Sequence, residues 1–251
     1  MTLYLADAPA VEYWRRADPS AKTRARAATP FGQDRETPPF SASDLAALEE
    51  AGVGWLSEPI HLLAPDASSR RRCKRTKLHV CSHRLPERSF VKLSSRVMVA
   101  SPELTCLSIA PSTPFPLLVE FLYELCGRYR LPDGRGGDAV ELPPATTVAG
   151  IERFADKARG VRGAADVKRA LRYACDNSLS PMETDIAETM VFDPRMGGLG
   201  LEKPQLNPRF EVTRKNRRAL PQSAYLPDLF WPRANISVEY DSDKHHRGDR
   251  K

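Results

Sequence analysis

The sequence predicts an α/β protein of the α+β type, with a mixed helix-and-strand half followed by a helical segment and a strand-rich C-terminal segment. Apolar residues recur at helical spacing over residues 115–129, 148–159, 164–176 and 180–192. Alternating apolar and polar side chains, typical of half-buried strands, occupy residues 77–83, 89–100 and 236–240. The 251 residues are 41% hydrophobic and 28% charged, which is enough apolar material for one good core or two smaller ones.

The first third of the chain begins with residues 1–40, which are rich in proline, alanine and charge, and we expect an irregular arm with one short helix there. A helix over 41–52 begins with Ser41 as its cap and ends at Gly52. Residues 53–63 are expected to form a short strand pair. Together with the strands up to residue 100, these elements predict a mixed α/β domain over 41–130 with a recognition or regulatory role.

The middle of the chain is predicted to be helical. Ser101-Pro102 predicts the start of a short helix, and the strongest helical pattern follows at 115–129. Residues 131–147 hold several glycines and the pair Pro143-Pro144, which predicts a linker. Beyond it, 148–251 is expected to contain a helical connector, helix 180–192 and then strands, one of them at 210–213.

Cysteine usage argues against a disulfide framework, because the five cysteines are odd in number and scattered. Cys106, Cys126 and Cys175 lie in apolar helical surroundings and are expected to be small core residues. A zinc site remains an alternative for Cys73, His79, Cys81 and His83, but their spacing matches none of the usual ligand pairs.

The net charge is +6, and many of the lysine and arginine residues lie in short runs, at 70–77 and 214–218. We expect these runs to bind the phosphates of a nucleic acid, although each is also compatible with a solvated loop. No apolar run approaches the roughly 20 residues of a membrane span, and the N-terminus lacks a basic signal-peptide region, so we expect a cytoplasmic protein without membrane contact. The residues expected to bind nucleic acid are Arg70, Arg71, Arg72, Lys74, Arg75, Lys77, Arg214, Lys215, Arg217 and Arg218.

A group of carboxylates near the C-terminus predicts a metal site. Glu239 and Asp241 point to one face of a strand, and a turn near Arg233 and Ala234 would place Asp228 opposite Glu239. Three carboxylates at one place suit Mg²⁺ or Mn²⁺. Two alternatives stay open: Asp228 begins a turn, and the Glu239/Asp241 pair is the solvent face of an edge strand.

Two further features accompany these carboxylates. Ser180-Pro-Met-Glu183 opens a helix as a capping box, and this structural role is the alternative to a functional one for Glu183. His245 and His246 follow the carboxylates, and the alternative for them is a charged tail.

Residues 178–251 resemble the PD-(D/E)xK endonuclease superfamily, and more closely its branch related to very-short-patch-repair endonucleases. The likeness lies in the helical Glu183, in Asp228 and in the run Glu239-Tyr-Asp241-Ser-Asp-Lys-His245-His246. It implies a restriction-endonuclease-like αβββ unit and metal-dependent hydrolysis of phosphodiester bonds. The implied metal ligands are Asp228, Glu239 and Asp241, the implied acid or base is His245 or His246, and Glu183 would orient a metal-bound water.

Two departures from the superfamily bear on activity. Asp241 stands where most members carry a lysine, as it does in the short-patch-repair-like branch. The sequence ends at Lys251, just after the third strand, whereas the superfamily core continues with a helix and a strand. We therefore expect an incomplete unit with weak or no catalysis and an exposed sheet edge open to self-association.

A second resemblance covers residues 41–175. The segments Val97-Met-Val-Ala-Ser101-Pro-Glu and Glu124-Leu-Cys-Gly-Arg-Tyr129 are similar to AbiEi-type antitoxin regulators. This likeness implies a winged-helix DNA reader and a cognate toxin as partner. Only one clear helix precedes the strands at 77–100, where a winged helix needs about three, so the reader is degenerate or absent. The alternative function is therefore a non-catalytic, DNA-binding transcriptional regulator.

Overall fold

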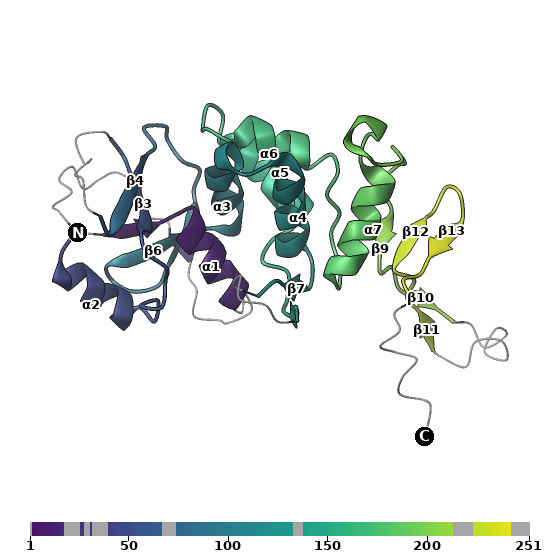
Figure 1. Ribbon diagram of the computed structural model, residues 1–251, viewed down its shortest axis with the longest axis horizontal. Coiled ribbons are helices and arrows are strands. Elements are labelled where there is room, and N and C mark those ends of the chain that lie inside the picture. The colour runs from purple at the N-terminus through teal and green to yellow at the C-terminus, as the bar shows by residue number, and fades with distance from the viewer. Residues whose placement is uncertain are drawn as a thin grey trace, which may run out of the picture.

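The computed structural model describes residues 2–17, 26–27, 31, 40–66, 74–132, 138–212 and 223–241. The arrangement is α/β, as predicted, with a sheet at the N-terminal end, helices in the middle and small strand pairs at the C-terminal end (Figure 1). Among the described residues, no helix is both long and apolar enough to cross a membrane.

A mixed sheet of six strands forms the N-terminal end, in the order β2-β5-β6-β1-β3-β4. Strand β1 lies inside this sheet, where it runs parallel to β6 and antiparallel to β3, while β3 and β4 run parallel to each other. The strands are β1 (Leu3–Leu5), β2 (Arg26–Ala27), β3 (Ile60–Ala64), β4 (Thr76–Val80), β5 (Phe90–Lys92) and β6 (Val97–Ala100).

The expected irregular arm over 1–40 is wrong for its first residues. Leu3 and Leu5 are 1% and 0% exposed, because β1 is an interior strand of the sheet. Helix α1 (Ala8–Arg16), which confirms the one short helix expected in this stretch, follows at once and buries Tyr13 and Trp14. The indole Nε1 of Trp14 donates to the Ala100 carbonyl at 2.9 Å, which ties α1 to β6. A three-residue strand is too short to show an alternating pattern, so composition alone was misleading here.

Helix α2 (Ala42–Glu50) confirms the capped helix predicted after Ser41, whose backbone N–H donates to Asp44 at 2.9 Å. The strand pair expected over 53–63 is wrong, since the described residues form the single strand β3 there. Within 40–66 and 74–100, α2 is the one helix, so the described part of this stretch contains no three-helix winged-helix reader.

The predicted helices of the middle segment are confirmed and pack on one another. A continuous hydrophobic core runs from Leu3 through these helices to Trp231, so the expected linker over 131–147 does not divide the core. Strand β7 (Tyr129–Arg130) lies just before that stretch and pairs with β8 (Val140–Glu141) inside it. The helices are α3 (Pro102–Ile109), α4 (Phe115–Cys126), α5 (Val148–Lys157) and α6 (Ala164–Ala170), with the short 3₁₀ turns η2 (Ala110–Ser112) and, later, η3 (Pro194–Met196).

At the C-terminal end, helix α7 (Pro181–Val191) lies beside a three-stranded sheet in the order β13-β12-β9 (Figure 1). The half-buried strand predicted over 236–240 is only partly right, because β13 ends at Val238 and Ile236 is 55% exposed. Strand β13 therefore lies at an edge of the described sheet, and the exposed Ile236 lies on a face that no described element covers. The strands are β9 (Gln205–Leu206), β10 (Phe210–Glu211), β11 (Ala224–Tyr225), β12 (Leu229–Trp231) and β13 (Ile236–Val238).

Candidate functional site

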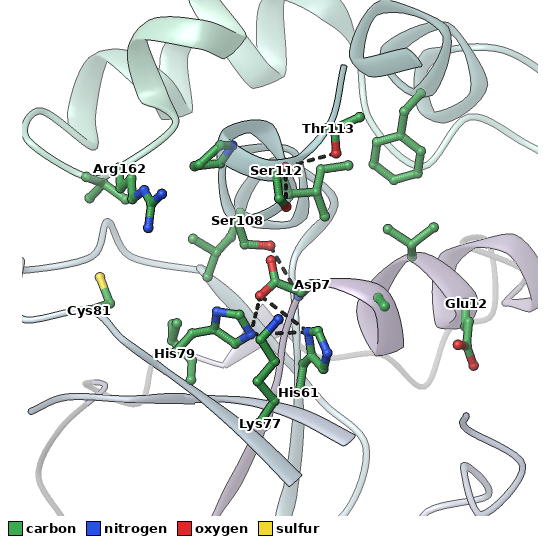
Figure 2. A pocket seen from close by; sticks show the side chains of 18 of the residues that line it. Asp7, Glu12, His61, Lys77, His79, Cys81, Ser108, Ser112, Thr113 and Arg162 are labelled. Atoms are coloured by element: carbon green, nitrogen blue, oxygen red, sulfur yellow. Dashed lines mark hydrogen bonds and ion pairs between the residues drawn. The ribbon is translucent and has the colours of Figure 1, made fainter. Parts of the chain in front are cut away.

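A cavity of about 1530 Å³ lies between the N-terminal sheet and the helices. Its walls come from α1, β3, β4, α3 and α4, and from residues 160–162 between α5 and α6. Figure 2 shows three side chains that point toward one another in this cavity, Asp7, His61 and His79.

Asp7 lies at the junction of β1 and α1, in an unusual backbone conformation with φ 53° and ψ −131°. Such a conformation is costly for a residue with a side chain and is found mainly at functional sites. Although Asp7 is the N-cap of α1, its carboxylate makes no capping hydrogen bond, and Pro9 in the first turn has no N–H to offer. The Asp7 N–H donates to Ser108 Oγ at 3.2 Å, and the carboxylate turns into the cavity.

His61 and His79 come from the neighbouring parallel strands β3 and β4. Their register pairs His61 with Lys77 and Leu63 with His79, so both imidazoles lie on the same face of the sheet. His79 Nε2 is 2.8 Å from Asp7 Oδ2 and 3.1 Å from His61 Nδ1. His61 Nδ1 lies 3.7 Å from the same Asp7 oxygen. Asp7, His61 and His79 thus each place one potential ligand atom within 4.8 Å of the others. No other trio of His, Cys, Asp or Glu does so among the described residues.

The electrostatics of the cluster favour neutral imidazole at His61. Burial lowers the pKa of His61, the neighbouring His79 lowers it further, and the Asp7 carboxylate opposes the shift. Four lysine and arginine side chains line the cavity, and two of them, Lys77 on β4 and Arg162 before α6, form no ion pair within the described part of the chain. A neutral imidazole can act as a metal ligand, and unpaired cations attract an anion.

The structure places Glu183 as its capping motif predicts, at the start of α7. Its backbone N–H donates to Ser180 Oγ at 3.2 Å, and its carboxylate accepts from Leu179 N at 2.9 Å and from Asn207 Nδ2 at 2.6 Å. Burial raises the pKa of Glu183, these hydrogen bonds oppose the shift, and the nearby Asp228 charge adds to it. Glu183 is thus buried, well supported by hydrogen bonds and close to Asp228.

The predicted hairpin brings Asp228 opposite Glu239, since the register pairs Leu229 with Val238. Asp228 Oδ2 accepts from the backbone N–H of Tyr240 at 2.6 Å, while the Tyr225 hydroxyl donates to Glu239 Oε1. That hydrogen bond raises the pKa of Tyr225, and the charges of Glu239 and Asp228 add to the shift. The side chains of Glu239 and Asp241 are exposed, and with Asp228 they do not gather within 4.8 Å of one another.

The expected nucleic-acid contacts are described only in part. Lys74 and Arg75 are exposed, and Arg75 Nε donates to Glu58 at 2.8 Å, while Lys77 lines the cavity beside the histidines. Lys77 is exposed and belongs both to the predicted basic run and to the wall of the cavity. The residues that lie outside the described part of the chain are Arg70, Arg71, Arg72, Arg214, Lys215, Arg217, Arg218, His245 and His246.

Sequence reasoning missed two members of the cavity cluster, Asp7 and His61. The sequence spacing groups His79 with Cys73, Cys81 and His83 rather than with residues of other strands. A lone histidine inside the apolar strand Ile60-His-Leu-Leu and an Asp-Ala-Pro junction were the available signals. Comparison with protein-family models, curated proteins and solved structures finds no match, so the function must be argued from these residues.

Proposed function

We propose that this chain hydrolyses phosphodiester bonds of nucleic acid, with DNA as the favoured substrate, in a reaction that depends on Mg²⁺ or Mn²⁺ held by Asp228 and Glu239. The observation that carries the proposal is the register of β12 and β13, which sets these two carboxylates opposite each other at one end of the small sheet. Hard divalent ions are commonly held by one or two carboxylates together with the phosphate of the substrate. Asp241, two residues beyond Glu239, is the proposed third ligand.

The setting of the carboxylates suits a large substrate. Glu239 and Asp241 are exposed and Asp228 is half-buried, so a polymer has access to them without entering a cavity. The basic residues 214–218 precede this hairpin in the sequence and would neutralise phosphates beside the metal. Such an ion would activate a water molecule and stabilise the charge that develops on the phosphate. A nucleic-acid substrate also agrees with the cytoplasmic location expected from the sequence.

Glu183 contributes to this proposed site by position rather than by contact with the metal. Its carboxylate is occupied by Leu179 and Asn207, and the backbone N–H of Asn207 donates to the Asp228 carbonyl at 3.0 Å. Glu183 thus supports the backbone that carries Asp228. This role differs from the water-orienting one that the family resemblance implies.

Mn²⁺ binding followed by isothermal titration calorimetry tests the proposal directly. We expect Asp228→Asn and Glu239→Gln to weaken Mn²⁺ binding by at least tenfold, with Glu152→Gln, an exposed carboxylate on α5, as the matched control. Cleavage of supercoiled plasmid and of RNA should be measured with protein in excess, so that slow turnover does not hide a single round of cutting. Mn²⁺ binding that survives Asp228→Asn, or cutting that survives Glu239→Gln, would contradict the proposal.

A non-catalytic DNA-binding regulator is the second candidate. It is favoured by the internal hydrogen bonds of the carboxylates, since Asp228 accepts from Tyr240 and Glu239 accepts from Tyr225. A regulator of antitoxin type would act with a toxin partner or as a self-associated form. Mobility shift of duplex DNA in EDTA, with no cleavage after Mn²⁺ is added, would select this function over hydrolysis.

A further inference from the structure

We infer that Asp7, His61 and His79 form a second and separate metal site, which binds one divalent transition-metal ion and presents it to a small ligand bearing an oxyanion. The inference does not depend on the proposed nuclease function, because the three residues lie in or beside the N-terminal sheet and none contacts the C-terminal carboxylates.

The separations of the three ligand atoms fit an ion of ordinary size. They are 2.8, 3.1 and 3.7 Å, and three points so spaced lie on a circle with a radius of about 1.9 Å. An ion about 0.9 Å out of their plane would therefore lie about 2.1 Å from each atom, the distance typical of Zn²⁺ with nitrogen and oxygen ligands. These separations therefore allow one ion to contact all three atoms at once.

Hydrogen bonding alone leaves this cluster poorly satisfied. If His79 Nε2 carries a proton, that proton can bond Asp7 Oδ2 or His61 Nδ1, which are 2.8 and 3.1 Å away. If the Nδ1 lone pair of His61 also points toward the cluster, it faces the Asp7 carboxylate at 3.7 Å, acceptor against acceptor. One cation between them satisfies all three atoms at once.

The donor set selects the class of metal. Two imidazoles and one carboxylate suit Zn²⁺ and Fe²⁺, whereas Mg²⁺ and Ca²⁺ prefer sites made of oxygen atoms alone. Three protein ligands leave at least one coordination position open, as in catalytic rather than structural sites. The backbone N–H of Asp7 donates to Ser108, which fixes the main chain from which the carboxylate enters the cavity.

The walls of the cavity indicate what the ion would meet. Lys77 lies beside His61 in the sheet register, and its ammonium points toward the cluster, while Arg162 points into the same cavity (Figure 2). Neither cation has an ion-pair partner among the described residues, so an anion would gain from both. A cavity of about 1530 Å³ admits a small molecule. The shared chemistry of such a ligand is a phosphate or carboxylate group.

Titration of the metal-free full chain with Co²⁺, which replaces Zn²⁺ and reports its ligands by visible absorption, tests the metal site. We expect one ion per chain, displacement by Zn²⁺ but not by excess Mg²⁺, and at least a hundredfold loss of affinity in His79→Ala and Asp7→Asn. The matched control is His83→Ala, which removes a cavity histidine outside the cluster. Circular dichroism identifies any variant that does not fold, and His61→Gln provides a third test of the cluster.

Co²⁺ binding that is unchanged in folded His79→Ala or His61→Gln would overturn the metal site. Asp228→Asn should leave Co²⁺ binding intact, so failure here and failure of the proposed nuclease are distinguishable. For the ligand, inorganic phosphate and acetate should perturb the Co²⁺ spectrum. Of phosphate and acetate, the anion that binds more tightly should lose about tenfold in affinity in Lys77→Ala and in Arg162→Ala. Arg172→Ala is the control. Equal affinity in all three variants would overturn the assigned ligand class.

Discussion

Replacing Glu188 with glutamine is expected to make the protein increasingly more stable than the wild type as the pH rises above about 5, and so to flatten the dependence of its stability on pH. Glu188 lies in α7 and is 7% exposed, and its Oε1 has no hydrogen-bond partner among the described residues. Burial raises the pKa of Glu188 to about 8, and the charges of Glu120 and Asp185 add to the shift. At neutral pH the folded protein therefore keeps this side chain protonated, against the phenols of Tyr123 and Tyr129.

The size of the effect follows from the difference between the folded and unfolded pKa values. A rise from 4.5 to about 8 corresponds to roughly 5 kcal/mol of unfolding free energy, at about 1.36 kcal/mol per pKa unit. The folded state binds the extra proton between these two values, so this stability is fully present below pH 4.5 and is lost as the pH rises to about 8. Glutamine keeps the shape of the protonated acid but cannot ionise.

Urea denaturation followed by circular dichroism at pH 5, 7 and 9 measures the effect. We expect Glu188→Gln to match the wild type near pH 5 and to exceed it by up to about 5 kcal/mol at pH 9, the full value of the pKa shift. Glu152→Gln, an exposed substitution on α5, controls for a change of net charge. A variant whose stability falls with pH as steeply as that of the wild type would refute the reasoning.

Four further outcomes are expected. Gly163→Ala should lower Tm sharply, since Gly163 has φ +90° and a Cβ there would lie 2.0 Å from the Leu107 carbonyl oxygen. Thermal melts check this prediction, with Ala164→Gly as the comparison variant at the neighbouring position. Arg130→Met should cost about 3 kcal/mol or more in urea denaturation, because its buried guanidinium donates to the carbonyls of Tyr129 at 2.6 Å and Pro143 at 3.0 Å, which would lose their partner. Alanine at Arg214, Lys215, Arg217 and Arg218 should weaken duplex-DNA binding and lower its salt dependence by about 0.9 log units per lost contact; an unchanged slope in fluorescence anisotropy would mark this run as a solvated loop. Ile236→Lys on the edge strand β13 should reduce any self-association seen by sedimentation velocity, whereas an unchanged association would place the contact elsewhere.

In the C-terminal half, local sequence patterns were enough to predict the cap of α7 and the pairing of β12 with β13. The serine cap and capping glutamate of α7 involve residues three apart, and the β12–β13 register follows from one short turn. Such features depend on neighbours in the sequence, so periodicity and turn chemistry predict them. The same short turn sets Asp228 opposite Glu239, as the sequence pattern predicts. How near the carboxylates approach was not predictable, because it depends on side-chain partners such as Tyr225 and on the backbone of Tyr240.

The cavity cluster was decided by the tertiary structure alone. Asp7 follows β1, whereas His61 and His79 lie on β3 and β4, and the three meet because the sheet orders these distant strands as β1-β3-β4. Strand β1 has only three residues, so its interior place comes from burial of Leu3 and Leu5 against distant strands rather than from a pattern of its own. Sequence by itself determined the helices, the caps and the fold class, whose causes are local. Strand order and the meeting of distant side chains come from long-range packing, which no short window of residues encodes.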